Sequence, residues 1–160
     1  MSRRLFQTER NAGLFIDVLR SLVAKHKFRL RDFVVMPDHV HLLIELDSEM
    51  TIEKAMQFIK GRFSHRLKQE FGHKSEVWQR GYSEKQVTDA ESMDKCSEYI
   101  AMNPVKAGLA QLANEYPFCF RFLAAQKVGL AGNAEDMQGL NRLRKNSRSE
   151  PFMQGKFSRG

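Results

Sequence analysis

Residues 34–46 read VVMPDHVHLLIEL, and this stretch decides the fold. The residues on either side of its Pro-Asp turn are apolar enough for two buried strands, yet the second strand carries His39 and His41 one residue apart. Successive side chains of a strand point to opposite faces, so the two imidazoles share one face. The other face is purely apolar and predicts a core, formed by Val40, Leu42, Ile44 and Leu46.

The spacing of apolar residues predicts six elements around this stretch. They are helix 11–26, strand 28–37, strand 39–46, helix 51–71, strand 77–87 and helix 89–103. Thr51 and Asp89 are suited to cap the N-termini of the second and third helices. Pro104 is expected to end the third helix, because proline lacks the N–H that a helix interior uses.

This order of elements predicts an α+β fold, a ferredoxin-like sandwich with an antiparallel sheet and helices. The standard unit is β-α-β-β-α-β, and its first strand is expected to be missing or truncated here, because only MSRRLFQTER precedes the first helix. Without that central strand the histidine strand would expose unpaired backbone groups. We therefore expect that the natural chain starts upstream, or that this form is unstable or aggregates.

Length and composition restrict the class of protein. The 160 residues fit one domain with a real core, and 42% of them are apolar. No apolar run is long enough to span a membrane, and the N-terminus does not resemble a secretory signal. Cys96 and Cys119 form neither a disulfide framework nor a zinc knuckle. These features predict a cytoplasmic protein.

Most of the net charge of +7 lies near the C-terminus. Residues 138–160 hold one acid, Glu150, and six basic residues, Arg142, Arg144, Lys145, Arg148, Lys156 and Arg159. We expect a catalytic domain over 1–125 and a basic, disordered tail over 126–160. Such a tail is usually just solvated; the functional alternative is that it helps to hold nucleic acid.

The two histidines on one strand face suggest a metal site. Imidazoles at positions i and i+2 stand roughly 7 Å apart along the strand, so their tips can converge on one ion. A single strand histidine is more often structural, but a pair on one face is harder to explain in that way. Two ligands are too few for a stable site, so a third is expected from elsewhere in the chain.

The motif MPDHVHLLI resembles the His-hydrophobic-His (HUH) motif of single-tyrosine transposases, in particular the REP-associated tyrosine transposases and their insertion-sequence relatives. The block YIAMNPVKAGLA (99–110) resembles the signature helix of that family. VWQRGYSEKQV (77–87) resembles its Trp-Gln strand, and LFQTERNAGLFIDVLR its first helix. The resemblance runs from about Leu5 to about Phe122.

This resemblance implies a role for each matching residue. His39 and His41 would ligate Mg²⁺ or Mn²⁺, with Asn103 as the third ligand, and Tyr99 would be the nucleophile that cleaves and rejoins single-stranded or hairpin DNA through a 5′-phosphotyrosine. Without the resemblance, Tyr99 reads as an ordinary half-buried helix residue, and Asn103 as the N-cap of a following turn. Asp38 either orients a ligand histidine or only makes the turn.

DNA contacts are expected from other segments. Lys60, Arg62, Arg66 and Lys68 form a basic helix face that predicts a phosphate track, although such faces are also routine on exposed helices. The aromatic candidates for stacking on bases are Trp78 and Tyr82, and the remaining cationic candidates are Arg80 and Lys106. Trp78 is equally suited to the core.

Two classes of function are compatible with these residues. The first is an active DNA strand transferase, and the second is a catalytically inactive, DNA-binding remnant of one. A metal-binding structural protein is a more distant third. We expect a monomer rather than a homodimer, and no membrane partner.

Overall fold

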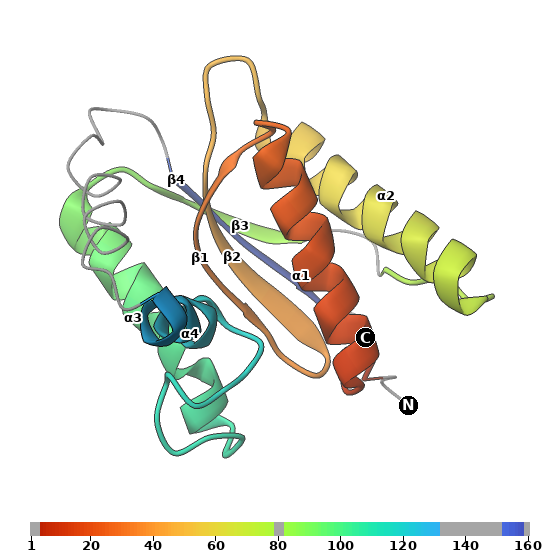
Figure 1. Cartoon of the computed structure of the whole chain (residues 1–160). Coiled ribbons are helices and arrows are strands. Elements are labelled where there is room, and N and C mark those ends of the chain that lie inside the picture. The colour runs from red at the N-terminus through yellow and green to blue at the C-terminus, as the bar shows by residue number, and fades with distance from the viewer. Residues whose placement is uncertain (1–3, 79–81, 132–151, 159–160) are drawn as a thin grey trace.

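The chain is built around a four-stranded antiparallel sheet, seen in a computed structural model that describes residues 4–78, 82–131 and 152–158. The elements are α1 (Glu9–Ala24), β1 (Arg29–Val35), β2 (His39–Glu45), α2 (Ile52–Phe71), β3 (Ser83–Val87), α3 (Ala90–Lys106), α4 (Phe120–Ala131) and β4 (Phe152–Ser158). The strand order is β1-β2-β4-β3, so the histidine strand β2 is an inner strand (Figure 1).

Helices cover both faces of this sheet. α1 and α2 lie side by side on one face, and α3 and α4 lie on the other (Figure 1). The larger core, between the sheet and α1 and α2, contains the fully buried Phe15, Phe63 and Leu42. A smaller core on the α3 side contains Leu43 and Ile100. The predicted α+β class and the apolar face of the histidine strand are both confirmed.

The helices begin where the capping residues predict. The hydroxyl of Thr51 accepts a hydrogen bond from the Lys54 amide, and the carboxylate of Asp89 accepts one from the Ser92 amide. α2 ends at Gly72, which has the left-handed backbone (φ 64°) that glycine adopts without strain. In the described residues no helix is both long and apolar enough to cross a membrane.

The predicted end of the third helix is wrong. α3 continues past Asn103 and through Pro104 to Lys106. Proline removes one backbone donor and crowds the carbonyl four residues before it. Close to the end of a helix this loss affects only the last turn, and the side-chain amide of Asn103 donates to the Tyr99 carbonyl at 2.9 Å.

The third strand is shorter than its sequence predicts. β3 covers only Ser83–Val87, while Val77 and Trp78 lie outside the strand and pack toward the core. Residues 79–81 are outside the described part of the chain. The segment predicted as one strand thus contains two parts: Val77 and Trp78 pack toward the core, and the strand itself begins at Ser83.

The C-terminal segment differs most from expectation. A structureless tail was expected from residue 126, but α4 continues to Ala131 and residues 152–158 form β4. β4 pairs antiparallel with β2 over His39–Glu45 and with β3 over Ser83–Val87. It occupies the central position that the first strand takes in the ferredoxin-like unit. The expectation that the inner edge of the histidine strand is exposed is therefore wrong.

Candidate active site

Three aromatic side chains from the sheet and α3 meet at one place. The ring centroids of His39 and His41 are 4.9 Å apart, and those of His41 and Tyr99 are 5.6 Å apart. His41 is only 1% exposed, whereas Tyr99 is 46% exposed. This exposure agrees with the description of Tyr99 as a helix residue half-buried against the sheet. The ring of Tyr99 rests on a buried histidine while much of its side chain remains open to solvent.

His39 has a fixed partner in the turn that precedes it. Its Nδ1 lies 2.7 Å from Oδ1 of Asp38. This hydrogen bond lowers the pKa of the Asp38 carboxyl, so the aspartate is ionised at neutral pH. A carboxylate on one imidazole nitrogen orients the ring and leaves Nε2 for another partner. The structure thus supports the orienting reading of Asp38 over the reading in which it only makes the turn.

Two further predicted residues lie on α3 beyond the tyrosine. Asn103 is inside the helix, so its alternative reading as the N-cap of a following turn is wrong. Its Nδ2 bonds to the Tyr99 carbonyl, which leaves Oδ1 as the atom available to a ligand. The ammonium group of Lys106 lies 5.3 Å from the Tyr99 ring centroid. One face of α3 therefore carries a tyrosine, an amide and a cation in successive turns.

The donor set fits a divalent metal only if it includes an amide oxygen. Within the described residues, no three His, Cys, Asp or Glu side chains gather around one point. The two imidazoles supply two nitrogen donors, and the oriented His39 has the arrangement common among metal-bound histidines. Asn103 Oδ1 would supply the third donor, and a set of two imidazoles and an oxygen suits Mn²⁺ at least as well as Mg²⁺.

A buried contact between β1 and α3 fixes the helix that carries Tyr99. The pairing of β1 with β2 is irregular between Leu30 and Asp32, and Asp32 is 3% exposed. Its carboxyl group accepts hydrogen bonds from the Phe33 amide at 2.8 Å and from the Ser97 hydroxyl of α3. Burial raises the pKa of Asp32 to about 6.

Sequence reasoning missed this contact. The usable signal is an acidic residue among the apolar positions of a strand, because a buried carboxyl group needs a hydrogen-bond donor from a packed neighbour. The Ser97 hydroxyl supplies that donor two residues before Tyr99.

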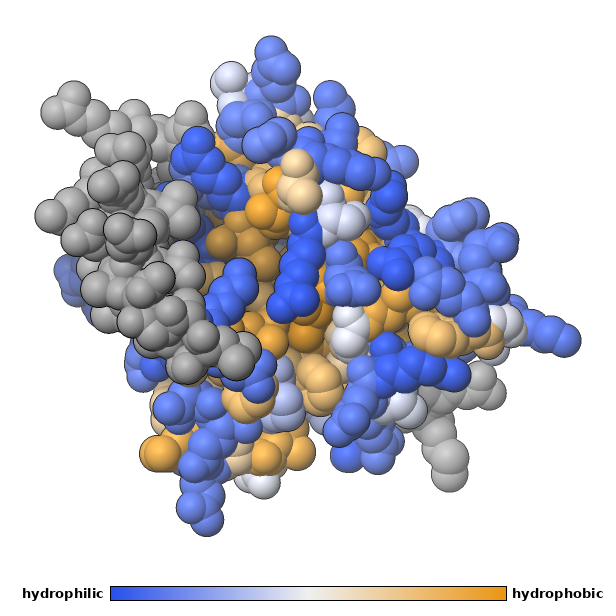
Figure 2. All heavy atoms as spheres, viewed as in Figure 1, coloured by the Kyte–Doolittle hydropathy of each residue, from blue (hydrophilic) through white to orange (hydrophobic). Residues whose placement is uncertain are grey.

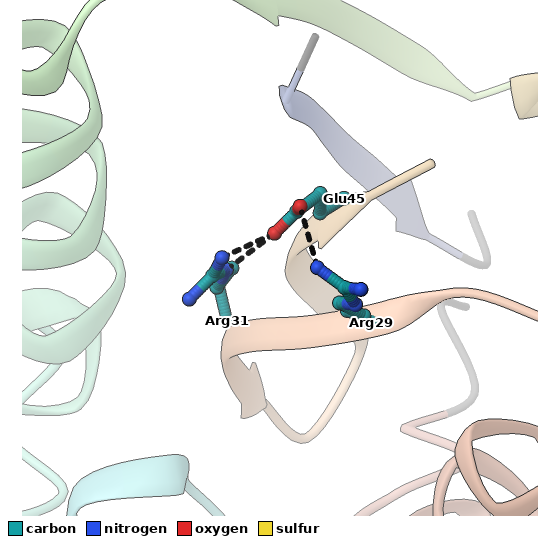
Figure 3. Close-up of polar contacts among 3 residues, drawn as sticks. All are labelled: Arg29, Arg31 and Glu45. Carbon is teal, nitrogen blue, oxygen red and sulfur yellow. Dashed lines mark hydrogen bonds and ion pairs between the residues drawn. The ribbon is translucent and has the colours of Figure 1, made fainter. Parts of the chain in front are cut away.

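Glu45, on the same strand as the histidines, forms ion pairs with Arg29 and Arg31. It lies opposite Arg29 at the end of the hairpin remote from His39. The side chains of Arg29 and Arg31 both point from β1 to its carboxylate (Figure 3). All three line an open pocket of about 420 Å³, to which neither His39 nor His41 contributes. Glu45 therefore belongs to this arginine cluster and not to the histidine site.

The expected DNA-binding residues of α2 lie on the opposite face of the sheet from Tyr99. Figure 2 shows mostly hydrophilic side chains along the outer side of α2, at the right of the view. Arg62 and Lys68 are exposed there. Arg66 instead pairs with Glu70 at 2.7 Å. The structure therefore does not bring this basic face to the candidate active site.

The aromatic candidates lie next to α2. Trp78 packs against Phe63 at 5.4 Å between ring centroids and donates its indole N–H to the Lys60 carbonyl at 2.9 Å. This is the position that the core alternative predicts for Trp78. The Lys60 ammonium lies 5.3 Å from the Tyr82 ring, and burial lowers the pKa of that lysine. Arg80 is outside the described residues, as are the basic residues 142–148.

Comparison with known sequences places the chain in a family. The sequence profile described as "Transposase IS200 like" matches residues 2–103, which contain both histidines, Tyr99 and Asn103. The chain belongs to this family. In this IS200-like protein, the histidine strand β2 and the helix α3 meet through His41 and Tyr99.

Several curated relatives of this IS200-like chain have informative names. A Haemophilus influenzae protein, provisionally named a REP-associated tyrosine transposase, is 27% identical over 114 residues, 65% of each chain. The REP-associated tyrosine transposase of Escherichia coli K12 is 27% identical over 107 residues, 64% of this chain and 62% of that protein. The transposase for insertion sequence element IS200 of Salmonella typhimurium is 31% identical over 72 residues, 41% of this chain and 47% of that protein.

The chain therefore spans less than two thirds of the length of these relatives. No solved structure matches it with significance.

Proposed function

We propose that this IS200-like protein is a transposase that cleaves and rejoins single-stranded DNA through a covalent link to Tyr99. The observation that carries the proposal is the contact between the exposed Tyr99 ring and the buried His41, 5.6 Å apart between centroids. These residues come from α3 and β2, which are distant in the sequence. A tyrosine beside two potential metal ligands combines a nucleophile with a site for a cation that can activate the phosphate, which suits covalent phosphodiester chemistry.

The reaction follows from the position of the phenol. Tyr99 Oη gives up its proton and attacks a phosphorus atom of the DNA backbone, and the bond from phosphorus to the 3′ oxygen breaks. The products are a 5′-phosphotyrosine and a free 3′-OH, which takes up a proton. Attack of a 3′-OH on the phosphotyrosine reverses the process and joins DNA. The covalent link retains the energy of the broken bond, so no ATP is consumed.

The other residues of the site bind the DNA phosphate or the metal ion, or orient the residues that do so. Solvent exposure of Tyr99 lets a flexible strand reach the phenol. Lys106 places a positive charge beside the ring, where a phosphate would lie. His39, His41 and Asn103 would hold Mg²⁺ or Mn²⁺, which when bound neutralises phosphate oxygens and orients them for in-line displacement. Asp38 fixes the ring of His39 for this purpose.

A basic protein of this kind is expected to hold DNA through its phosphates. The net charge of +7 supports binding that weakens as salt rises. Because Trp78 packs against the core, we assign base stacking to Tyr82. Hairpin DNA with a single-stranded flank is the proposed substrate, and the protein is proposed to act as a monomer.

The decisive experiment is capture of the covalent intermediate. The intact protein is incubated with labelled single-stranded hairpin DNA and Mn²⁺, and denaturing gels are searched for a protein–DNA adduct. Adduct should form with the wild type and with Tyr82→Phe, the matched control, and should vanish with Tyr99→Phe. DNA binding should survive in all three, because only a hydroxyl is lost.

Two outcomes would contradict the proposal. Adduct that persists in Tyr99→Phe, or that mass spectrometry maps to another tyrosine, would remove Tyr99 from the chemistry. DNA binding without any adduct, with Mg²⁺ as well as Mn²⁺, would favour the catalytically inactive remnant. Tyr116 is not a suitable control, because its buried hydroxyl donates to the Val35 carbonyl at 2.7 Å and its loss would disturb β1.

A further inference from the structure

The inner edge of the histidine strand requires a partner. β2 is buried on both faces, with Leu42 in the larger core and His41 and Leu43 on the α3 side. An inner strand with an open edge would leave backbone N–H and C=O groups unpaired beside a core, which costs as much as lost hydrogen bonds. In the described residues this edge is paired along its whole length by β4, from His39 opposite Ser158 to Glu45 opposite Phe152.

The same strand connects β2 to the segment that leads into the tyrosine helix. β3 pairs with β4 from Ser83 opposite Lys156 to Val87 opposite Phe152. Four of the five β3 residues are exposed and only Val87 is buried, so side-chain packing holds β3 weakly. Its position therefore depends on the backbone pairing with β4. Two residues after β3, Asp89 caps the N-terminus of α3, the helix that carries Tyr99.

We propose that residues 152–158 of the same chain are a positioning element of the histidine–tyrosine site. As the central strand, they hold the histidine strand on one side and the strand leading into α3 on the other. In this chain the C-terminal segment thus takes the structural role of the first strand of the ferredoxin-like unit. The inference rests on strand pairing and not on the proposed chemistry, so either can fail without the other.

A disulfide between β3 and β4 tests where β4 lies and whether it belongs to the same chain as β3. Ser83 and Lys156 are partners in the register, and neighbouring strands in such a pair lie within the Cα range of a disulfide. The double variant Ser83→Cys/Lys156→Cys should form a disulfide within one chain under mild oxidation. Glu84→Cys/Lys156→Cys is the matched control, because Glu84 is next along the strand and points to the other face.

Each result of the crosslinking either supports or overturns the inference about β4. A disulfide within the monomer in the first variant and not in the control supports the inference. No disulfide in the first variant, or equal amounts in both, overturns it. Disulfide found only between two chains also overturns it, because the central strand would then come from a second copy of the protein. Mass spectrometry after proteolysis separates these cases and also excludes the native buried thiols, Cys96 and Cys119.

Deletion then tests whether the strand positions the site. A chain that ends at residue 151 is compared with one that ends at Ser158, which keeps all of β4. Hydrogen exchange should show loss of protection in β2 and β3 for the shorter chain only. Complete unfolding of the shorter chain would also show that β2 and β3 require β4. Unchanged protection of β2 after the deletion would overturn the inference, whatever the activity of the protein.

Discussion

Asp32 gives the fold a pH dependence that one substitution should remove. Its carboxyl group lies between β1 and α3, where burial raises the pKa from 3.8 to about 6. A carboxyl group with a raised pKa stabilises the folded state in its protonated form. The contribution is complete below pH 3.8 and is lost as the pH rises through about 6. A shift of about two pKa units corresponds to about 3 kcal/mol in the free energy of unfolding.

The variant Asp32→Asn stays neutral at every pH and keeps an oxygen that accepts from the Phe33 amide. Its amide also remains within hydrogen-bonding reach of the Ser97 hydroxyl. Relative to the wild type, the variant should therefore gain up to about 3 kcal/mol at pH 8 and almost nothing at pH 4. Urea denaturation at pH 4, 6 and 8 measures the difference.

The matched control is Asp94→Asn, an exposed aspartate on α3. It should leave the pH dependence of the wild type unchanged. The comparison uses the difference in stability between the two proteins at each pH, so that contributions common to both cancel. Parallel stability curves for the wild type and Asp32→Asn would refute the reasoning and show that the carboxyl group is ionised in the folded protein.

Two further predictions concern residues that flank the histidine strand. Asp38→Ala removes the carboxylate that orients His39 and should weaken Mn²⁺ binding, measured by calorimetry, by about 10-fold or more; equal affinity would mean that the ring needs no such support. Arg31→Met should destabilise the fold by about 3 kcal/mol, because it deprives the buried Glu45 of its more buried partner. Arg29→Met removes the more exposed partner and should lower the free energy of unfolding by less than about 1 kcal/mol. Thermal unfolding measures both variants, and a larger loss of stability in Arg29→Met than in Arg31→Met would contradict the burial argument.

The histidine strand could be predicted because its signal is local. Alternation from His39 onward separates an apolar face from an imidazole face without reference to any other segment. The same holds for the helix starts at Thr51 and Asp89, where a capping side chain bonds to an amide three residues away. The contact of His41 with Tyr99 was expected only from the family resemblance, because spacing alone does not show which helix covers the imidazole face.

The missed features depend on distant partners. β4 has the sequence FMQGKFS, in which glycine and lysine weaken the strand signal, and its partners lie far back in the chain. Pro104 misled the prediction of the helix end, because proline is tolerated when only the last turn remains. For Trp78 the sequence left two roles open, and packing against Phe63 decides between them. In each case tertiary contacts override a local preference.

The position of β4 in the chain also affects the order in which the protein can fold during synthesis. The histidine strand is translated more than 100 residues before the strand that pairs with its inner edge. Contacts between such distant segments form slowly, and unpaired edges of nascent chains are prone to aggregation. Among the described strands, β1 is the one that can pair with β2 before residues 152–158 emerge from the ribosome. Chains released before residues 152–158 are synthesised would therefore have an incomplete sheet, so that synthesis of β4 is needed for the complete site.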